Sequence, residues 1–218
     1  PKLLPPGRAV EHLADGVYSP SSNNEIFPIP LIDYVSIIGE SADGVVLDAQ
    51  NITRVMTGVS VDDATVSNMT LMHGYGERGG GLYLAYSDIY LNNIILKENT
   101  ADMGGGMFLF GALYPDGLTK SADFITEDVI IANNHANYHG GGIFILGWET
   151  HLSNMIITEN SSGQIGGGIS VFMFFKSSFT IFTKSFLHDN LGRSISSANQ
   201  SAKIANERPS YYGLHKKQ

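Results

Sequence analysis

The chain alternates between short apolar segments and polar or glycine-containing turns. The apolar segments are rich in Ile, Val, Phe, Thr and Tyr and end at Asn, Gly or Asp. Short segments that alternate in polarity, or run apolar for a few residues between turn residues, are typical of β-strands. No segment sustains a helical period, and the intervals leave no room for a helix of about ten residues. We therefore predict an all-β chain of short strands and turns.

The turns repeat at a fixed interval along the chain. Four Gly-Gly-Gly triplets, at 79–81, 104–106, 140–142 and 166–168, are separated by 25, 36 and 26 residues. The longer interval predicts an insertion at 112–122, which contains a Pro-Asp-Gly turn. A fixed period of this length is the mark of a repeat architecture in which each unit contacts its neighbours.

Asparagines recur in step with the glycine triplets. An apolar-x-x-Asn tetrad precedes each later triplet, and a second polar position lies six residues before that Asn. Stacked coils would bring equivalent asparagines together, where each can hydrogen-bond its own coil and the next Asn. The predicted structural ladder consists of Asn99, Asn134, Asn160 and Asn190 with Asn68, Asn93 and Asn154.

The tetrad and triplet together resemble the right-handed parallel β-helix repeats of the pectate-lyase-like superfamily, and in particular those of polymorphic outer-membrane proteins. The resemblance implies a single right-handed parallel β-helix of about 25-residue coils over 1–218. We expect a cap or irregular first coil at 1–34, coils over 35–190 and a C-terminal end at 191–218. It also implies an extracellular or bacterial cell-surface location. Lyases, hydrolases and adhesins share this fold, so the fold leaves the activity open.

Composition narrows the classes of partner. The formal net charge of −8 argues against nucleic acid, whose phosphates need a basic surface. The lack of cysteine excludes disulfides and thiol catalysis. No apolar run approaches the roughly 20 residues of a membrane-spanning helix.

Strand alternation predicts an outward aromatic column after the glycine triplets. Tyr83, Phe108 and Phe144 share one outward position, and Phe110 and Phe172 share the next. Three interpretations stay open: a platform for sugar rings, a patch for a protein partner, or rings covered by the chain's own insertion and the 172–175 run.

Polar residues beside the turns are candidates for catalysis. Glu98, Asp102, His139 and Glu159 are the nearest set for acid–base chemistry on a uronate polymer. If their coils are successive, Glu159 and Asp189 lie close enough to bridge Ca²⁺, and no other cofactor is expected. The competing interpretation is that these charges only solvate the outer turns.

The leading hypothesis is an extracellular or cell-surface β-helix that binds a polysaccharide. If its polar residues converge, it also cleaves that polymer as a lyase or glycoside hydrolase. The alternative is a non-catalytic adhesin, passenger or structural module that binds a surface protein.

Overall fold

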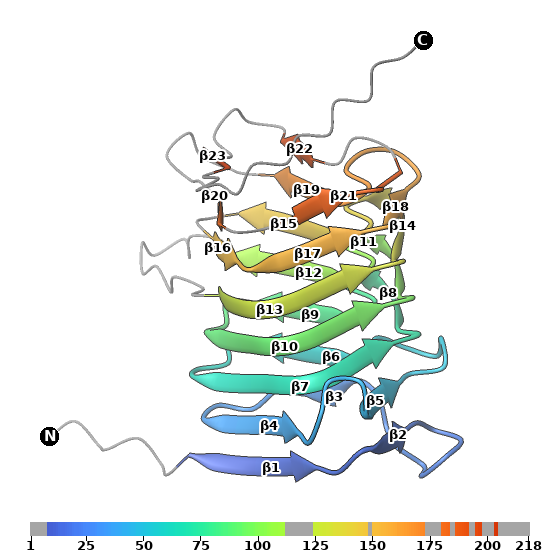
Figure 1. Ribbon diagram of the computed structural model, residues 1–218, viewed down its shortest axis with the longest axis vertical. Helices are drawn as coiled ribbons and strands as arrows, with labels where there is room; N and C mark the ends of the chain where they lie inside the picture. The colour runs from blue at the N-terminus through green and yellow to red at the C-terminus, as the bar shows by residue number, and fades with distance from the viewer. Residues whose placement is uncertain are drawn as a thin grey trace, which may run out of the picture.

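The computed structural model describes residues 8–111, 124–147, 150–172, 180–183, 186–191, 195–197 and 203–204. These residues contain strands and turns but no helix, so none of them forms a membrane-spanning helix. The strands stack as the successive coils of a right-handed parallel β-helix (Figure 1). The predicted fold class is thus confirmed.

The strands form four parallel sheets. Sheet A, at the front in Figure 1, contains β1 (Ala9–Leu13), β2 (Gly16–Tyr18), β4 (Val35–Gly39), β5 (Val45–Asp48), β7 (Ala64–Met72), β10 (Ile89–Lys97), β13 (Phe124–Ala132), β17 (Met155–Thr158) and β21 (Phe186–His188). Sheet B, behind it, contains β3 (Ile29–Pro30), β6 (Met56–Val59), β9 (Leu82–Ala85), β12 (Met107–Gly111), β15 (Ile143–Gly147), β19 (Ile169–Phe172) and β22 (Ile195–Ser197). Sheet C contains β8 (Tyr75–Arg78), β11 (Thr100–Met103), β14 (His135–His139) and β18 (Ser161–Ser162). Sheet D contains β16 (Thr150–Ser153), β20 (Thr180–Thr183) and β23 (Lys203–Ile204).

Each regular coil passes through sheet A, then sheet C, then sheet B. Ile89 of β10 pairs with Ala64 of the preceding coil and with Phe124 of the following one. Residues 9–34 supply the first described coil, because β1 pairs with β4 and β3 with β6. Sheet B extends past residue 190 through β22, and the insertion expected at 112–122 lies outside the described residues.

The coils turn at corners where the backbone adopts positive φ. One corner uses the Asn68, Asn93, Asp128 and Asn154 positions. Another uses His73, Glu98, Asn133, Glu159 and Asp189, and a third uses the first glycine of each triplet. Asn and Asp tolerate this left-handed conformation better than most residues, and glycine adopts it freely. The inward positions between corners carry Leu, Ile, Val and Met, which form one continuous buried core.

An asparagine ladder closes the inner corner between sheets A and C. Asn134 is buried, and its Nδ2 donates to the Leu96 carbonyl (2.9 Å) and to Asn160 Oδ1 (3.0 Å). Its Oδ1 accepts from the backbone N and Nδ2 of Asn99, both at 3.0 Å. Asn160 repeats these bonds toward Asn190. The ladder therefore provides hydrogen-bond partners for the polar groups that are buried at this corner.

A second, solvent-exposed set of asparagines lies at the corner within sheet A. Asn93 donates to Asn68 Oδ1 at 3.0 Å, and Asn154 donates to Asp128. Asn68 donates in turn to the Gly39 carbonyl at 3.1 Å. These bonds link successive coils, but water competes for them, so the buried ladder contributes more to stability.

The central glycine of each triplet lies where the backbones of successive coils come closest. A Cβ built on Gly105 would lie 2.3 Å from the His135 carbonyl oxygen and 2.5 Å from that of Gly141. Both neighbours are backbone atoms and cannot rotate away. The triplet is therefore a steric requirement of coil stacking at this corner.

We expect Asn134→Ala to lower the free energy of unfolding by about 3 kcal/mol, because it leaves buried donors and acceptors unpaired. Urea unfolding would measure the loss. Asn92→Ala, at an outward position of β10, is the matched control and should cost less than about 1 kcal/mol. Equal losses in the two variants would contradict a stabilising role of the ladder.

We expect Gly105→Ala to cost more than about 2 kcal/mol, since its methyl group would overlap carbonyl oxygens of the next coil. Gly16→Ala, whose Cβ would have no atom within about 3.5 Å, should change stability by less than about 1 kcal/mol. Thermal unfolding of both variants tests this, and a Gly105→Ala protein as stable as the parent would refute the close approach.

Candidate functional site

The outward aromatic residues of sheet B stack from coil to coil. The rings of Tyr83 and Phe108 have centroids 5.5 Å apart with an interplanar angle of 19°. Phe108 and Phe144 follow at 5.2 Å and 15°. The register pairs these residues directly on β9, β12 and β15, so the ring spacing follows the spacing of the coils.

Arginine side chains cover the outer faces of this column. The guanidinium of Arg54, from the turn before β6, lies 4.8 Å from the centre of the Tyr83 ring. Arg78, the last residue of β8, lies 5.6 Å from the centre of the Phe108 ring. Guanidinium groups at these distances are attracted to the negative face of an aromatic ring.

Neither arginine forms an ion pair with any residue that the structure describes. Arg54 is half-buried, and its pKa is lowered from the ordinary value chiefly by desolvation, while Tyr83 and Glu77 act in the opposite direction. Arg78 is exposed. We define Arg54, Arg78 and Tyr83 as the arginine–tyrosine edge, the part of the column that reaches solvent.

The aromatic column is only partly open. Phe108 is 0% exposed and Phe144 is 4% exposed, so neither ring has a free face. Tyr83 and Phe110 are half-buried, and Phe172 is exposed. The insertion and most of the 172–175 run, the segments expected to cover the rings, lie outside the described residues. A sugar could therefore contact Tyr83, Phe110 or Phe172. Phe108 and Phe144 are buried and are not accessible to a sugar.

His139 lies two coils beyond Arg78 at the same position of the coil. Its ring lies 6.2 Å from Phe144, and its Nδ1 is buried without a hydrogen-bond partner among the described residues. Met103 and His139 pair across β11 and β14, and Met103 also pairs with Arg78. Arg78, Met103 and His139 thus occupy one column at the end of sheet C, while Arg54 lies outside it, in the turn before β6.

The four residues expected to act in catalysis do not form one cluster. Glu98 contacts His73, and Asp102 accepts a hydrogen bond from Asn137 at 2.8 Å. Glu159 is exposed at the same corner as Glu98 but two coils away, with the corner residue Asn133 between them. No hydrogen bond or ion pair between described residues joins any two members of the set.

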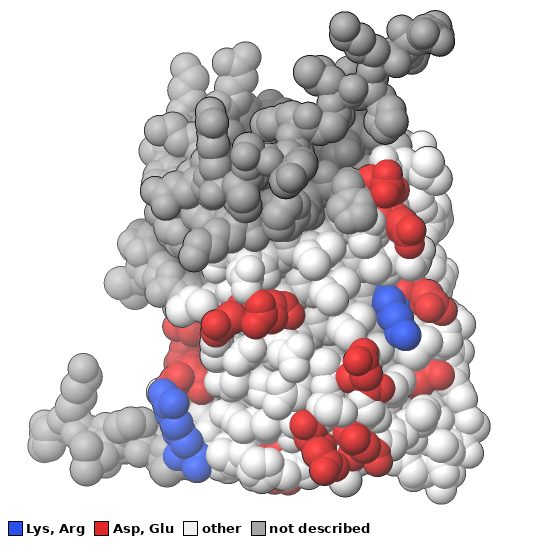
Figure 2. All heavy atoms as spheres, in the orientation of Figure 1, with Lys and Arg blue, Asp and Glu red and all other residues white. Residues whose placement is uncertain are grey.

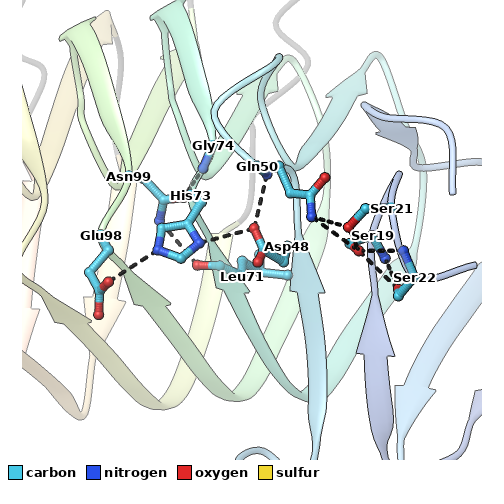
Figure 3. A network of polar contacts seen from close by, with 10 residues as sticks. All are labelled: Ser19, Ser21, Ser22, Asp48, Gln50, Leu71, His73, Gly74, Glu98 and Asn99. Atoms are coloured by element: carbon cyan, nitrogen blue, oxygen red, sulfur yellow. Dashed lines mark hydrogen bonds and ion pairs between the residues drawn. The ribbon is translucent and has the colours of Figure 1, made fainter. Parts of the chain in front are cut away.

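A different polar cluster forms around His73, at the corner that follows sheet A (Figure 3). The ring nitrogens lie 3.0 Å from Asp48 Oδ1 and 3.1 Å from Glu98 Oε2, on opposite sides of the imidazole. Both ring nitrogens thus lie within hydrogen-bond distance of a carboxylate oxygen. Asp48, His73 and Glu98 come from three successive coils, so the cluster bridges coils.

The Ca²⁺ bridge between Glu159 and Asp189 stays a prediction. The register of β17 and β21 places Glu159 and Asp189 at equivalent corners of successive coils. Two carboxylates fall short of the six to eight oxygens that Ca²⁺ takes. Within the described ranges, no group of three or more His, Asp or Glu side chains is arranged to hold a metal ion.

Sequence reasoning missed Arg54 and the His73 cluster, although the repeat carried a signal for both. Asp48, His73 and Glu98 are spaced 25 residues apart, as are Arg54 and Gly79. Extending the 25-residue register upstream of the first triplet would have aligned them. The burial of Phe108 could not be predicted in this way. Strand alternation predicts which side of a strand a residue faces, but not whether another segment covers that side.

Comparisons with known proteins give no family for the chain. No protein-family model matches it. It is 28% identical over 121 residues to metabotropic glutamate receptor-like protein P of Dictyostelium discoideum, a match that covers 52% of this chain and 8% of that protein. The chain therefore spans less than a tenth of that relative's length.

Among solved structures, the chain is similar to a crystal structure of a pectin methylesterase mutant in complex with a hexasaccharide. The identity is 11% and the TM-score is 0.46, over 95% of this chain and 84% of that one. The strand register described above, not this similarity, establishes the β-helix.

We expect a double-mutant cycle of His73→Asn and Glu98→Gln to give a coupling energy of about 0.5–1 kcal/mol, as half-exposed ion pairs do. Asn at position 73 keeps the positive φ accessible. The same cycle with His12→Asn, on exposed β1, should give a value near zero. Urea unfolding of the six proteins supplies the data, and a coupling no larger than that of the control would show that the contact is not formed.

Proposed function

We propose that this β-helix binds an acidic polysaccharide at the arginine–tyrosine edge. The observation that carries the proposal is the pair of guanidinium groups, which lie over outward aromatic rings and form no ion pair in the described part of the structure. Planar guanidinium groups bind carboxylates and sulfates through two parallel hydrogen bonds. Tyr83 adds a partly exposed aromatic surface for a sugar ring.

The charge of the chain makes this edge distinctive. The chain carries 13 basic and 21 acidic residues, so two arginines that form no ion pair within the described ranges are unusual on an acidic protein. Stacking holds each guanidinium in place, and less side-chain entropy is lost when a ligand binds. Because Arg54 and Arg78 belong to successive coils, about 4.8 Å apart, they suit a ligand with repeated negative charges.

Cleavage is not part of the proposal. Hydrolysis of a glycosidic bond needs two carboxyl groups on either side of it, and β-elimination needs a base beside the acidic proton. Glu98, Asp102, His139 and Glu159 are dispersed over two corners of the coil and provide neither arrangement. An extracellular location, in keeping with a polysaccharide ligand and with a relative named as receptor-like, belongs to the same proposal.

We expect Arg54→Gln with Arg78→Gln to weaken binding to polygalacturonate at least tenfold, as measured by isothermal titration calorimetry. Binding by the parent protein should weaken with added salt, since exposed charge contacts are screened. Lys97→Gln, which removes one cation from sheet A, is the matched control and should bind as the parent does. Incubation with the polymer should release no unsaturated, ultraviolet-absorbing product.

Three results would contradict the proposal. Failure of the parent to bind polygalacturonate and sulfated polysaccharides would exclude an acidic glycan ligand. Equal binding by the double variant and the parent would place the site elsewhere on the molecule. Release of unsaturated products would show that the chain is a lyase.

A further inference from the structure

A second surface lies on sheet A, the sheet at the front of the molecule in Figure 1. We propose that an isoleucine column on this sheet, flanked by carboxylates, binds a basic amphipathic helix of a partner protein. The column consists of Ile95, Ile130 and Ile156, which the register aligns on β10, β13 and β17. It is independent of the arginine–tyrosine edge, which lies on sheets B and C.

The isoleucines point outward, away from the core. Their strand neighbours Ile94, Val129 and Met155 are buried to within 1% exposure, so alternation turns the column to solvent. Ile156 is 41% exposed, and Ile95 and Ile130 are half-buried. These three outward β-branched side chains do not contribute to the core of the solenoid. Aligned apolar side chains on a surface are typical of interaction sites.

Carboxylates lie on both sides of the column, from one coil on the first side, where Asn93 and Asn154 occupy the adjacent corners, and from three coils on the second. Asp128 lies at the corner on one side, and Glu127 precedes it. Glu98, Glu159 and Asp189 lie at the corner on the other side, and all three are exposed. Lys97 is the one Lys or Arg among the described residues of β10, β13 and β17. Figure 2 shows this face, with acidic side chains on either side of an uncharged area.

The dimensions favour a helix as the occupant. A helix places an apolar residue on one face every 5.4 Å, and the coils repeat about every 4.8 Å, so two turns match three isoleucines to within about 1.2 Å. The two corners are separated by four residues, and the five intervals between them span about 16 Å, which exceeds the roughly 10–12 Å diameter of a helix. Lysines on both flanks of the helix would therefore reach the carboxylates on the two sides.

Repulsion between carboxylates argues against a second copy of this chain as the partner that binds the isoleucine column. Two such faces would oppose their carboxylates to each other, and the chain as a whole carries a net charge of −8. A basic partner gains attraction from the same carboxylates and buries the isoleucines between them. The structure thus favours a partner that combines an apolar stripe with lysine or arginine flanks.

The test uses a fluorescent 18-residue helical peptide with leucines at i, i+4, i+7 and i+11 and lysines on both flanks. Fluorescence anisotropy with the full chain should give saturable binding that weakens with salt.

Ile130→Ser with Ile156→Ser should raise the Kd at least tenfold. Glu159→Gln with Asp189→Asn should raise the Kd and reduce its salt dependence. Ile52→Ser, at a residue 65% exposed on a turn outside sheet A, is the matched control and should leave the Kd unchanged. All variants should keep the parent's urea unfolding midpoint, because each altered side chain is at least partly exposed.

Other outcomes would overturn the proposal. Equal binding of a peptide with glutamates in place of the lysines would remove the role of charge, and an unchanged Kd in the isoleucine variant would remove the role of the column. Absence of binding at micromolar concentrations would exclude a helical partner of this chemistry. Dimerisation of the parent that the isoleucine variant abolishes, measured by light scattering, would assign the face to a second copy.

Discussion

Hydrogen bonding between successive coils is the interaction on which the rest of this structure depends. The parallel strands supply most of it, but the corners would leave polar groups unpaired without the buried asparagines. Asn99, Asn134 and Asn160 each donate to a backbone carbonyl of the preceding coil and to the next asparagine side chain. This contact fixes the register, and the register decides which residues share each column.

Both proposed binding surfaces follow from that register. A residue type that recurs at one position of the coil becomes a continuous line on the surface. The aromatic rings of sheet B and the isoleucines of sheet A are two such lines, built in the same way on different sheets. They differ in their flanking charges, which are arginines on one and carboxylates on the other. Two chemically distinct ligands can thus be accommodated on one solenoid.

The fold was predictable because its determinants are local and repeated. The tetrads and triplets mark corners, and strand alternation assigned Tyr83 and Phe108 to the same outward column. The candidate site was less predictable, since it depends on side chains that reach across coils. The contacts of His73 with Asp48 and Glu98 depend on the rotamer of the His73 side chain. Arg54 reaches the Tyr83 ring from the turn before β6. The separation of Glu98, Asp102 and Glu159 likewise could not be predicted without the geometry of the corners.

The asparagine ladder has a direction. Each Oδ1 accepts from the coil before it: Asn99 Oδ1 accepts from the Gly74 backbone N at 2.8 Å, and Asn134 Oδ1 accepts from Asn99. A coil therefore has its inner corner completed by a residue that leaves the ribosome later. As long as the chain ends before Asn134, the backbone N and Nδ2 of Asn99 lack this acceptor.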